Sequence, residues 1–410
     1  MNAMKKMSAV VDFNKRKKEI FLKIWELVDK NYALFSEINI NWIEAKNEYL
    51  NLIEYISTEE ELYTLIEDML CELKDAHTRI YLNSHSKMGF YPITVKNLDG
   101  DYYIVDNQEK NSHISKGMKI KYINQMPIQD FCNFIHSKYS YKSKNLNNIV
   151  LLRYFQECKL GDSVKLTVES KGKEVTELVK KQFIKTIDLK AIKMNLQYLP
   201  LSMCNCREID NKIGYIKILS FNDQKVELDF YDALNSNLNK KFLIIDIRDN
   251  QGGLVSVAKK ITSMLLKSTC LIGYKYTRKE GGTHYEFEEA KEVKLDPAMS
   301  IKLNFKKIII LCNEYTSSSA EFIFLRALKN HHESIKIVGK TTAGLVHGAT
   351  IYTLGDYFKI QLTTSKYTDT NNKILEQQGI TPDIEIENRV EYFVDNVDCQ
   401  LIEAKRLCEN

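Results

Sequence analysis

The stretch Phe242-Leu-Ile-Ile-Asp-Ile-Arg-Asp-Asn-Gln-Gly-Gly-Leu254 combines a short apolar strand with a polar turn. An apolar run of this length is typical of a strand buried inside a sheet. The turn ends in Gly252 and Gly253, and an amphipathic segment over 254–267 indicates a helix after it. Paired glycines let backbone amides approach a ligand, so this turn is a candidate oxyanion site. The alternative is a tight turn whose Asp and Arg side chains are merely solvated.

A second segment follows the same strand, turn and helix plan. The apolar run 308–312 leads into the turn 313–319 and then into a helix that begins near Ala320. A serine held at such a turn can expose its hydroxyl beside a free amide, as in a nucleophile elbow. The residues from Thr316 to Ser319 are equally suited to cap the helix, so the segment alone supports either interpretation.

The surrounding pattern indicates a mixed α/β protein. Strand-like runs over 213–219, 243–247, 308–312 and 335–339 alternate with amphipathic helices over 223–238, 254–267 and 318–329. Helical periodicity dominates from about residue 10 to 70, and short β-type runs separated by glycine turns follow from about 88 to 183. Hairpin-like segments over 348–353 and 357–363 precede a closing helix at about 390–407.

Two further segments carry residues that can do chemistry. Leu73-Lys-Asp-Ala-His-Thr-Arg-Ile80 contains His77 between an expected helix and an expected strand. A histidine can move protons near neutral pH, although a single one is more often structural. Leu375-Glu-Gln-Gln-Gly-Ile-Thr-Pro-Asp-Ile-Glu-Ile386 places Glu376 before a Gly and a Pro-Asp turn, which alone indicates a surface loop.

Together these segments resemble the serine peptidases of the C-terminal processing (tail-specific) family and the tricorn protease core. The resemblance rests on Asp75-Ala-His-Thr78, Asp246-Ile-Arg-Asp-Asn-Gln-Gly-Gly253, Thr316-Ser-Ser-Ser-Ala-Glu321, Gly339-Lys-Thr-Thr-Ala-Gly344 and Gly379-Ile-Thr-Pro-Asp383, in the order of the family. It implies a ClpP/crotonase-like catalytic core over 186–410, a helical N-terminal segment over 1–87 with the His77 motif, and an inserted PDZ-like β module over 88–185.

The resemblance also assigns roles. Its nucleophile falls on Ser318, three residues before Glu321. Its oxyanion donors fall on the Ser319 amide and on the amide of Gly252 or Gly253, a choice that the sequence leaves open. In the tricorn-like branch, His77 is the general base and Glu376 the acidic partner.

Other bases are possible. In the Ser-Lys branch a lysine follows the glycine of the Gly-x-x-Thr-x-Gly stretch, and here that position is Leu345, which cannot accept a proton. Lys340 is a candidate for a shifted dyad, and His347 is a rival base or a substrate contact. The tricorn protease has a serine before its histidine, where this chain has Ala76, so either Glu376 reaches His77 directly or through water, or Asp75 orients the ring.

The composition of the chain limits the classes of partner, cofactor and compartment that we expect. The 410 residues carry a net charge of +4, which argues against a dedicated nucleic-acid binder despite the basic run from Lys15 to Lys18. Nine cysteines without zinc-type spacing indicate reduced thiols, and no signal peptide or membrane-length apolar run is visible. We therefore expect a cytoplasmic protein off the membrane, with no metal or organic cofactor. The family assembles variously, so a homo-oligomer is compatible with the sequence.

The function expected from the sequence is hydrolysis of peptide bonds in a polypeptide substrate through an acyl-enzyme on Ser318. The PDZ-like module implies that a carboxyl-terminal tail of the substrate is recognised by strand addition and capture of its carboxylate. The alternative is a non-catalytic protein that binds a peptide or another ligand on the same fold.

Overall fold

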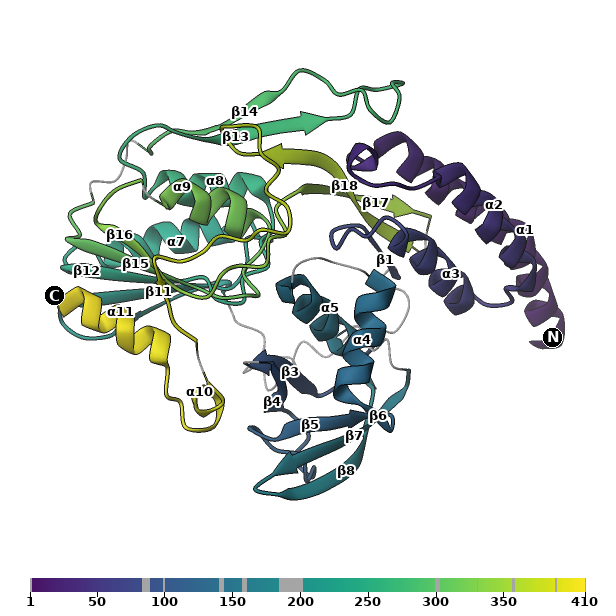
Figure 1. Cartoon of the computed structure of the whole chain (residues 1–410), viewed down its shortest axis with the longest axis horizontal. Helices are drawn as coiled ribbons and strands as arrows, with labels where there is room; N and C mark the ends of the chain where they lie inside the picture. The colour runs from purple at the N-terminus through teal and green to yellow at the C-terminus, as the bar shows by residue number, and fades with distance from the viewer. Residues whose placement is uncertain are drawn as a thin grey trace.

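The computed structural model describes residues 2–82, 89–98, 100–139, 144–156, 161–183, 202–298, 303–329, 331–355, 358–387 and 389–409. Figure 1 shows the N-terminal helices at the right, a β-rich module with two helices below, and the C-terminal helix at the left. The structure is mixed α/β, as predicted. None of its described helices is both long and apolar enough to span a bilayer.

Three helices form the N-terminal part: α1 (Asn2–Asn31), α2 (Trp42–Leu52) and α3 (Glu59–Cys71). Helix α3 begins with a capping box in which Thr58 and Glu61 satisfy each other's backbone amides. The apolar faces of these helices do not form a separate core, because they pack on Phe358, Ile360 and Leu362 near the other end of the sequence.

A five-stranded sheet explains that packing. Its order is β1 (Arg79–Leu82), β18 (Phe358–Thr368), β13 (Cys270–Thr277) and β14 (Lys291–Leu295), with β17 (Gly348–Leu354) paired to β18. Strand β1 runs antiparallel to β18, so Arg79 lies opposite Gln361. This pairing carries the segment around His77 to the C-terminal half of the chain. The predicted hairpin is β17 and β18, although Tyr357 lies outside the described residues.

The central sheet has six strands in the order β10 (Cys204–Glu208), β11 (Ile213–Ile218), β12 (Phe242–Asp246), β15 (Lys307–Cys312), β16 (Ile335–Gly339) and β19 (Ile384–Glu385). All pairs are parallel except the antiparallel pair at β10. The predicted strands at 213–219, 243–247, 308–312 and 335–339 are therefore confirmed, to within a residue or two at their ends.

Helices cover both faces of this sheet. On one face lie α7 (Lys225–Ser236), α8 (Val255–Ser263) and a π-helical turn (Ala320–Leu325) that continues into α9 (Arg326–Leu328); α11 (Cys399–Glu409) lies on the other (Figure 1). Alternate side chains of β15 point to opposite faces of the sheet. Ile308 and Ile310 pack on the face covered by α8, and Ile309 and Leu311 pack on the face covered by α11. The helices predicted at 223–238 and 254–267 correspond to α7 and α8. The closing helix corresponds to α10 (Glu391–Val394) and α11.

The inserted module is a second six-stranded sheet with two helices. Its strands are β3 (Ile93–Leu98), β4 (Asp101–Asn107), β5 (Lys119–Ile123), β6 (Met126–Pro127), β7 (Ser163–Ser170) and β8 (Lys173–Lys180). Short strands β2 (Gly89–Phe90) and β9 (Gln182–Phe183) pair where the chain enters and leaves it. Helices α4 (Ile128–Tyr139) and α5 (Lys144–Gln156) were not predicted, and the apolar residues of α5 are spread around its axis rather than concentrated on one face.

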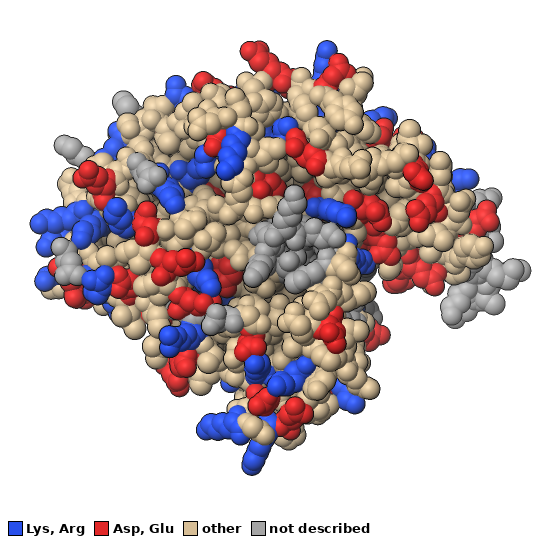
Figure 2. Space-filling view, viewed as in Figure 1, with Lys and Arg blue, Asp and Glu red and all other residues tan. Residues whose placement is uncertain are grey.

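Charge is distributed without a dominant sign. Figure 2 shows basic and acidic side chains interspersed over most of the visible face. This mixture suits the near-neutral net charge of +4.

Candidate active site

Ser318 lies in the turn that joins β15 to the π-helical turn. Its backbone has φ 58°, a left-handed conformation that is unusual for a residue with a side chain. Hydrogen bonds to two neighbouring segments help to hold this turn: the Ser318 amide donates to Leu345 O at 2.7 Å, and the Ser317 amide donates to Asn250 O at 3.0 Å. The second bond links the serine turn to the glycine turn that follows β12. The strained backbone is therefore supported from two neighbouring segments.

The two glycines of the other turn have different surroundings. A Cβ on Gly252 would lie 2.7 Å from Ser318 Cβ, so only glycine allows the turns to approach this closely. The Gly252 amide is already used, because it donates to Asn250 Oδ1 at 2.8 Å. In the described part of the chain the amides of Gly253 and Ser319 make no hydrogen bond, and both residues line the cavity that contains Ser318. These two free amides are the better oxyanion donors.

His77 is held by its backbone on a short loop between α3 and β1. Its amide donates to Asp75 Oδ1 at 2.9 Å, and its carbonyl accepts from Gln361 Nε2 at 3.0 Å. The second Asp75 oxygen accepts from Thr78 Oγ1 at 2.6 Å. His77 is 4% exposed, and the Nδ1 atom of its ring has no partner among the described residues. Burial first, and then His347, Arg153 and Arg79, lower the pKa of His77 well below its usual value.

Glu376 lies close to the imidazole of His77. One ring nitrogen of His77 and one carboxylate oxygen from each of Asp75 and Glu376 all lie within 4.8 Å of one another. Glu376 Oε2 accepts from the amides of Val346 and His347 at 2.8 and 3.1 Å. Burial, followed by the Asp75 carboxylate, raises the pKa of Glu376 well above its ordinary value. Glu376 therefore neighbours His77 directly, and no serine at position 76 is needed to bring the two side chains together.

The same three side chains are donors that zinc can use. Both Asp75 oxygens and Glu376 Oε2 already accept hydrogen bonds from the protein. These bonds anchor both carboxylates beside the imidazole, which is the arrangement that a proton-transfer cluster needs.

The two rival bases have other partners. Lys340 Nζ pairs with Glu387 Oε1 at 2.5 Å and does not line the cavity of Ser318. His347 does line it, but its Nδ1 accepts from the Tyr367 amide at 3.1 Å, and its Nε2 lies 3.9 Å from Glu376 Oε2. Burial and then Lys366 lower the pKa of His347 to about 3.

A cavity of about 680 Å³ gathers these groups. Ser318 and His77 both line it, although no hydrogen bond joins their side chains in the described residues. Such bonds are often long before substrate binds. The remaining wall is partly apolar and partly cationic: Leu254, Val255, Phe322, Ile323, Leu345, Val346 and Ile351, with Arg79, Arg153 and Lys275.

The residues that support the site were not predicted to do so. Glu321 is fully buried and its carboxylate accepts from Thr342 Oγ1, at 2.5 Å, and from the Gly344 and Leu345 amides. Burial raises the pKa of Glu321 to about 7. A single charged residue within the apolar run 320–325 was a signal in the sequence that could have identified it.

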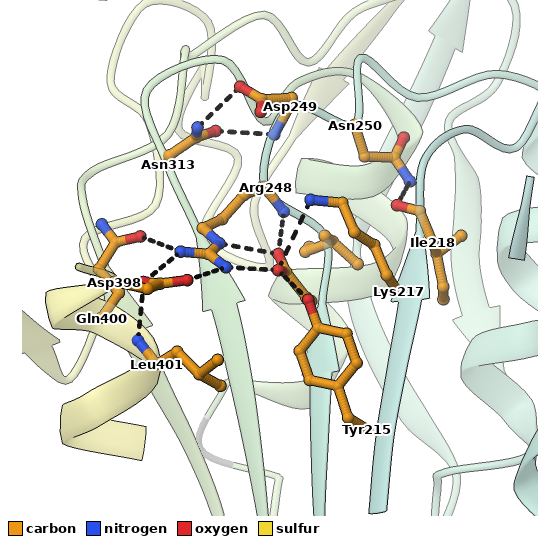
Figure 3. A network of polar contacts seen from close by, with 12 residues as sticks. Tyr215, Lys217, Ile218, Arg248, Asp249, Asn250, Asn313, Asp398, Gln400 and Leu401 are labelled. Atoms are coloured by element: carbon orange, nitrogen blue, oxygen red, sulfur yellow. Dashed lines mark hydrogen bonds and ion pairs between the residues drawn. The ribbon is translucent and has the colours of Figure 1, made fainter. Parts of the chain in front are cut away.

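An ion-pair network stabilises the base of the glycine turn (Figure 3). Arg248 Nη2 lies 2.6 Å from Asp246 Oδ2, and Arg248 Nη1 lies 2.8 Å from Asp398 Oδ1. Tyr215 also donates to Asp246. Burial opposes ionisation of Asp246, but Arg248 and then Lys217 hold its pKa below the ordinary value. The network fastens the end of β12 to the start of α11.

Comparison with known protein families agrees with this geometry. Residues 212–386 match the model of peptidase family S41, and residues 13–71 match the tricorn protease C1 domain. This chain therefore contains a region similar to peptidase family S41 and a region similar to the tricorn protease C1 domain. The first match contains Ser318, the glycine turn and Glu376. The resemblance predicted from the sequence is therefore confirmed.

Individual curated proteins are similar to this chain over most of its length. The chain is 26% identical to a putative tricorn-like protease C-terminal subunit of Sulfurisphaera tokodaii, covering 99% of this chain and 46% of the relative. It is 25% identical to a probable CtpA-like serine protease of Staphylococcus epidermidis, covering 85% of this chain and 65% of the relative. The chain thus spans less than two thirds of the length of these relatives. Among solved structures, mature CPAF complexed with lactacystin shares the fold at a TM-score of 0.74 and 16% identity, with 97% and 99% of the two chains covered.

Proposed function

We propose that this chain is a serine peptidase that cleaves peptide bonds of polypeptides through an acyl-enzyme on Ser318. The observation that carries the proposal is the left-handed Ser318 in a cavity shared with His77, beside the unbonded amides of Ser319 and Gly253. This is the set of groups that acyl transfer needs: a nucleophile, a base and two donors for the oxyanion.

In the proposed reaction, His77 takes the proton of Ser318 as the hydroxyl attacks the substrate carbonyl. The lowered pKa of His77 keeps its ring unprotonated, and so able to accept that proton, at pH values below 6.5. The amides of Ser319 and Gly253 stabilise the oxyanion, His77 returns the proton to the leaving amine, and water then hydrolyses the ester. Glu376, whose carboxylate lies in the same cluster as the ring, stabilises the imidazolium that forms.

The test is labelling with a fluorophosphonate probe, followed by peptide mapping. We expect the probe on Ser318 of the wild type, and loss of labelling in Ser318→Ala and His77→Ala. Lys340→Ala is the matched control and should label normally, because Lys340 pairs with Glu387 outside the cavity. A folded wild-type protein that labels on no serine would contradict the proposal and favour a non-catalytic binding protein.

We further propose that the catalytic core is ClpP/crotonase-like and that residues 88–185 form a PDZ-like module that recognises a carboxyl-terminal tail. The parallel β11 to β16 sheet supports the first, and a six-stranded sheet with two helices supports the second. Fusing different tails to a reporter tests recognition: cleavage rates should depend on the tail, and equal rates would contradict the idea.

We also propose a compartment, partners and an oligomeric state for this protein. The described cysteines are all free thiols, which suits the reducing cytoplasm. We expect a polypeptide to be the partner, with neither nucleic acid nor membrane involved, and a homo-oligomer is compatible with the family. Measurement of the mass in solution and of the compartment in cells would test both statements.

A further inference from the structure

Helix α5 of the inserted module holds two of the segments that form the candidate active site. Near its start, Asn145 Nδ2 donates to Thr341 O at 2.9 Å and to Thr342 O at 3.0 Å. Near its end, Arg153 Nη1 donates to Ala76 O at 2.9 Å. Ala76 directly precedes His77. The helix therefore touches both the loop that carries the proposed base and the segment that leads to Leu345.

Apolar contacts join the same helix to the serine turn. One small buried cluster contains Ala76, Ile149, Leu152, Tyr315, Ala343 and Leu345. Ile149 and Leu152 come from one side of α5, and Tyr315 comes from the turn that carries Ser318. Since packed interiors are dense, a shift of α5 would be transmitted to all three segments.

Unlike Asn145, Ile149 and Leu152 on the same helix, Arg153 also lines the cavity that contains His77. Because Ala76 has no polar side chain, Arg153 forms its hydrogen bond with the backbone carbonyl of Ala76. The positive charge of Arg153 disfavours protonation of the nearby imidazole, after the larger contributions of burial and His347.

We propose that Arg153 is a positioning residue for His77, which it orients through the Ala76 carbonyl while its guanidinium lines the same cavity as the imidazole. The inference rests on the proposed function, in which His77 is the general base. It assigns a part of the active site to the inserted module, which is separated from both His77 and Ser318 in the sequence.

Two consequences follow from the contact. A base displaced by about 1 Å can slow a reaction on the order of 100-fold, so loss of the Arg153 bond should lower kcat more than it raises KM. The charged and titratable groups that face His77 are Asp75 on its own loop, Glu376 before β19, His347 after β16, Arg79 on β1 and Arg153 on α5. Removal of one of the two arginines should make the imidazole easier to protonate.

The experiment compares Arg153→Met, which keeps most of the apolar stem, with Arg153→Lys, which keeps the charge. Peptide hydrolysis is measured as kcat and KM from pH 4 to 9. In parallel, the His77 ring is titrated by NMR in each variant combined with Ser318→Ala. We expect kcat of the Met variant to fall at least about 10-fold, with the His77 titration moved to higher pH. The Lys variant should keep the His77 titration of the wild type and recover part of kcat.

Lys138→Met is the matched control. Lys138 on α4 also ties the module to the N-terminal helices, with Nζ 2.6 Å from Asp68 Oδ1, and it does not line the cavity. It should leave kcat and the His77 titration unchanged. Wild-type kcat and His77 titration in a folded Arg153→Met protein would overturn the inference. So would equal losses in the Met and Lys variants with an unmoved titration, since those indicate support of the fold alone.

The two proposals fail in different ways. A wild-type protein without labelling or hydrolysis contradicts the peptidase function. The NMR titration does not need turnover, so an unmoved His77 in Arg153→Met contradicts the positioning role whether or not the protein cleaves peptides.

Discussion

The backbone amide of Ser318 donates its hydrogen bond to the carbonyl of Leu345, at 2.7 Å. Leu345 is itself held by Glu321, whose Oε2 accepts from the Leu345 amide at 3.1 Å. Glu321 lies only three residues after Ser318 in the sequence. The backbone N–H and C=O of Leu345 therefore both bond to the same short segment. The backbone of Ser318, the proposed nucleophile, is thus held in place through Leu345 by a fully buried carboxylate.

This relationship predicts the effect of Glu321→Gln. The new amide group is almost isosteric, but its NH₂ would face the Leu345 N–H, so two donors would meet in a buried place. We expect kcat/KM for peptide hydrolysis to fall about 100-fold and the free energy of unfolding to fall by about 1–3 kcal/mol. The control is Glu314→Gln in the same turn, whose side chain makes no hydrogen bond to residues 342–347 in the described structure. Equal losses of activity in both variants would contradict the assigned role.

Gly252→Ala should disable the nucleophile. The added Cβ would lie 2.7 Å from Ser318 Cβ and 2.9 Å from the Ser319 amide nitrogen, so the serine turn must move. We expect fluorophosphonate labelling to slow by about 100-fold or more. Gly281→Ala is the control, because Gly281 also has a positive φ but a Cβ there would meet nothing within 4 Å. If both variants label equally slowly, backbone strain and not the contact with Ser318 is responsible.

Arg248→Met should destabilise the fold strongly. The substitution leaves the fully buried Asp246 without its guanidinium partner, and an uncompensated buried charge costs about 3–5 kcal/mol. Urea denaturation monitored by circular dichroism measures the loss. For comparison, Arg406→Met removes a surface ion pair with Glu403 and should change the free energy of unfolding little. A loss as small as this for Arg248→Met would show that Lys217 and Tyr215 suffice to hold Asp246.

His347 predicts a pH dependence of stability. Its pKa is about 3 in the folded protein, against an ordinary value of about 6.5 in the unfolded chain. Between these pH values the unfolded state binds a proton that the folded state excludes, so this contribution to stability is lost as the pH falls below 6.5. His347→Asn does not titrate and retains an oxygen that can accept from the Tyr367 amide.

From pH 7 to pH 4.5 the variant should therefore gain about 2–3 kcal/mol relative to wild type in free energy of unfolding. Denaturant titrations at both pH values provide the measurement. His113→Asn, on a side chain that is 84% exposed, should follow the wild type. A His347→Asn protein that loses stability in parallel with the wild type would mean that the ring is protonated in the folded state.

Much of the core could be predicted from the sequence because its signals are local. The apolar run 308–312 indicates β15, and alternate residues of that strand do pack on opposite faces of the sheet. The glycine and serine turns also follow from residues adjacent in the chain, which is why the S41 resemblance could be seen. Helix α5 was missed because its apolar residues are spread around the axis rather than along one face.

Only the tertiary structure decided which groups meet. Pairing of β1 with β18 brings the His77 loop to the other half of the chain, and packing of α5 adds Arg153 from the inserted module. The sequence did not decide whether Gly252 or Gly253 supplies the expected oxyanion donor. In the fold the Gly252 amide donates to Asn250, whereas the Gly253 amide makes no hydrogen bond in the described part of the chain. Apolar periodicity determines strands and helices because each depends on near neighbours. The gathering of His77, Ser318 and Arg153 around one cavity depends on how those elements pack, since nothing in the local sequence encodes the distance between them.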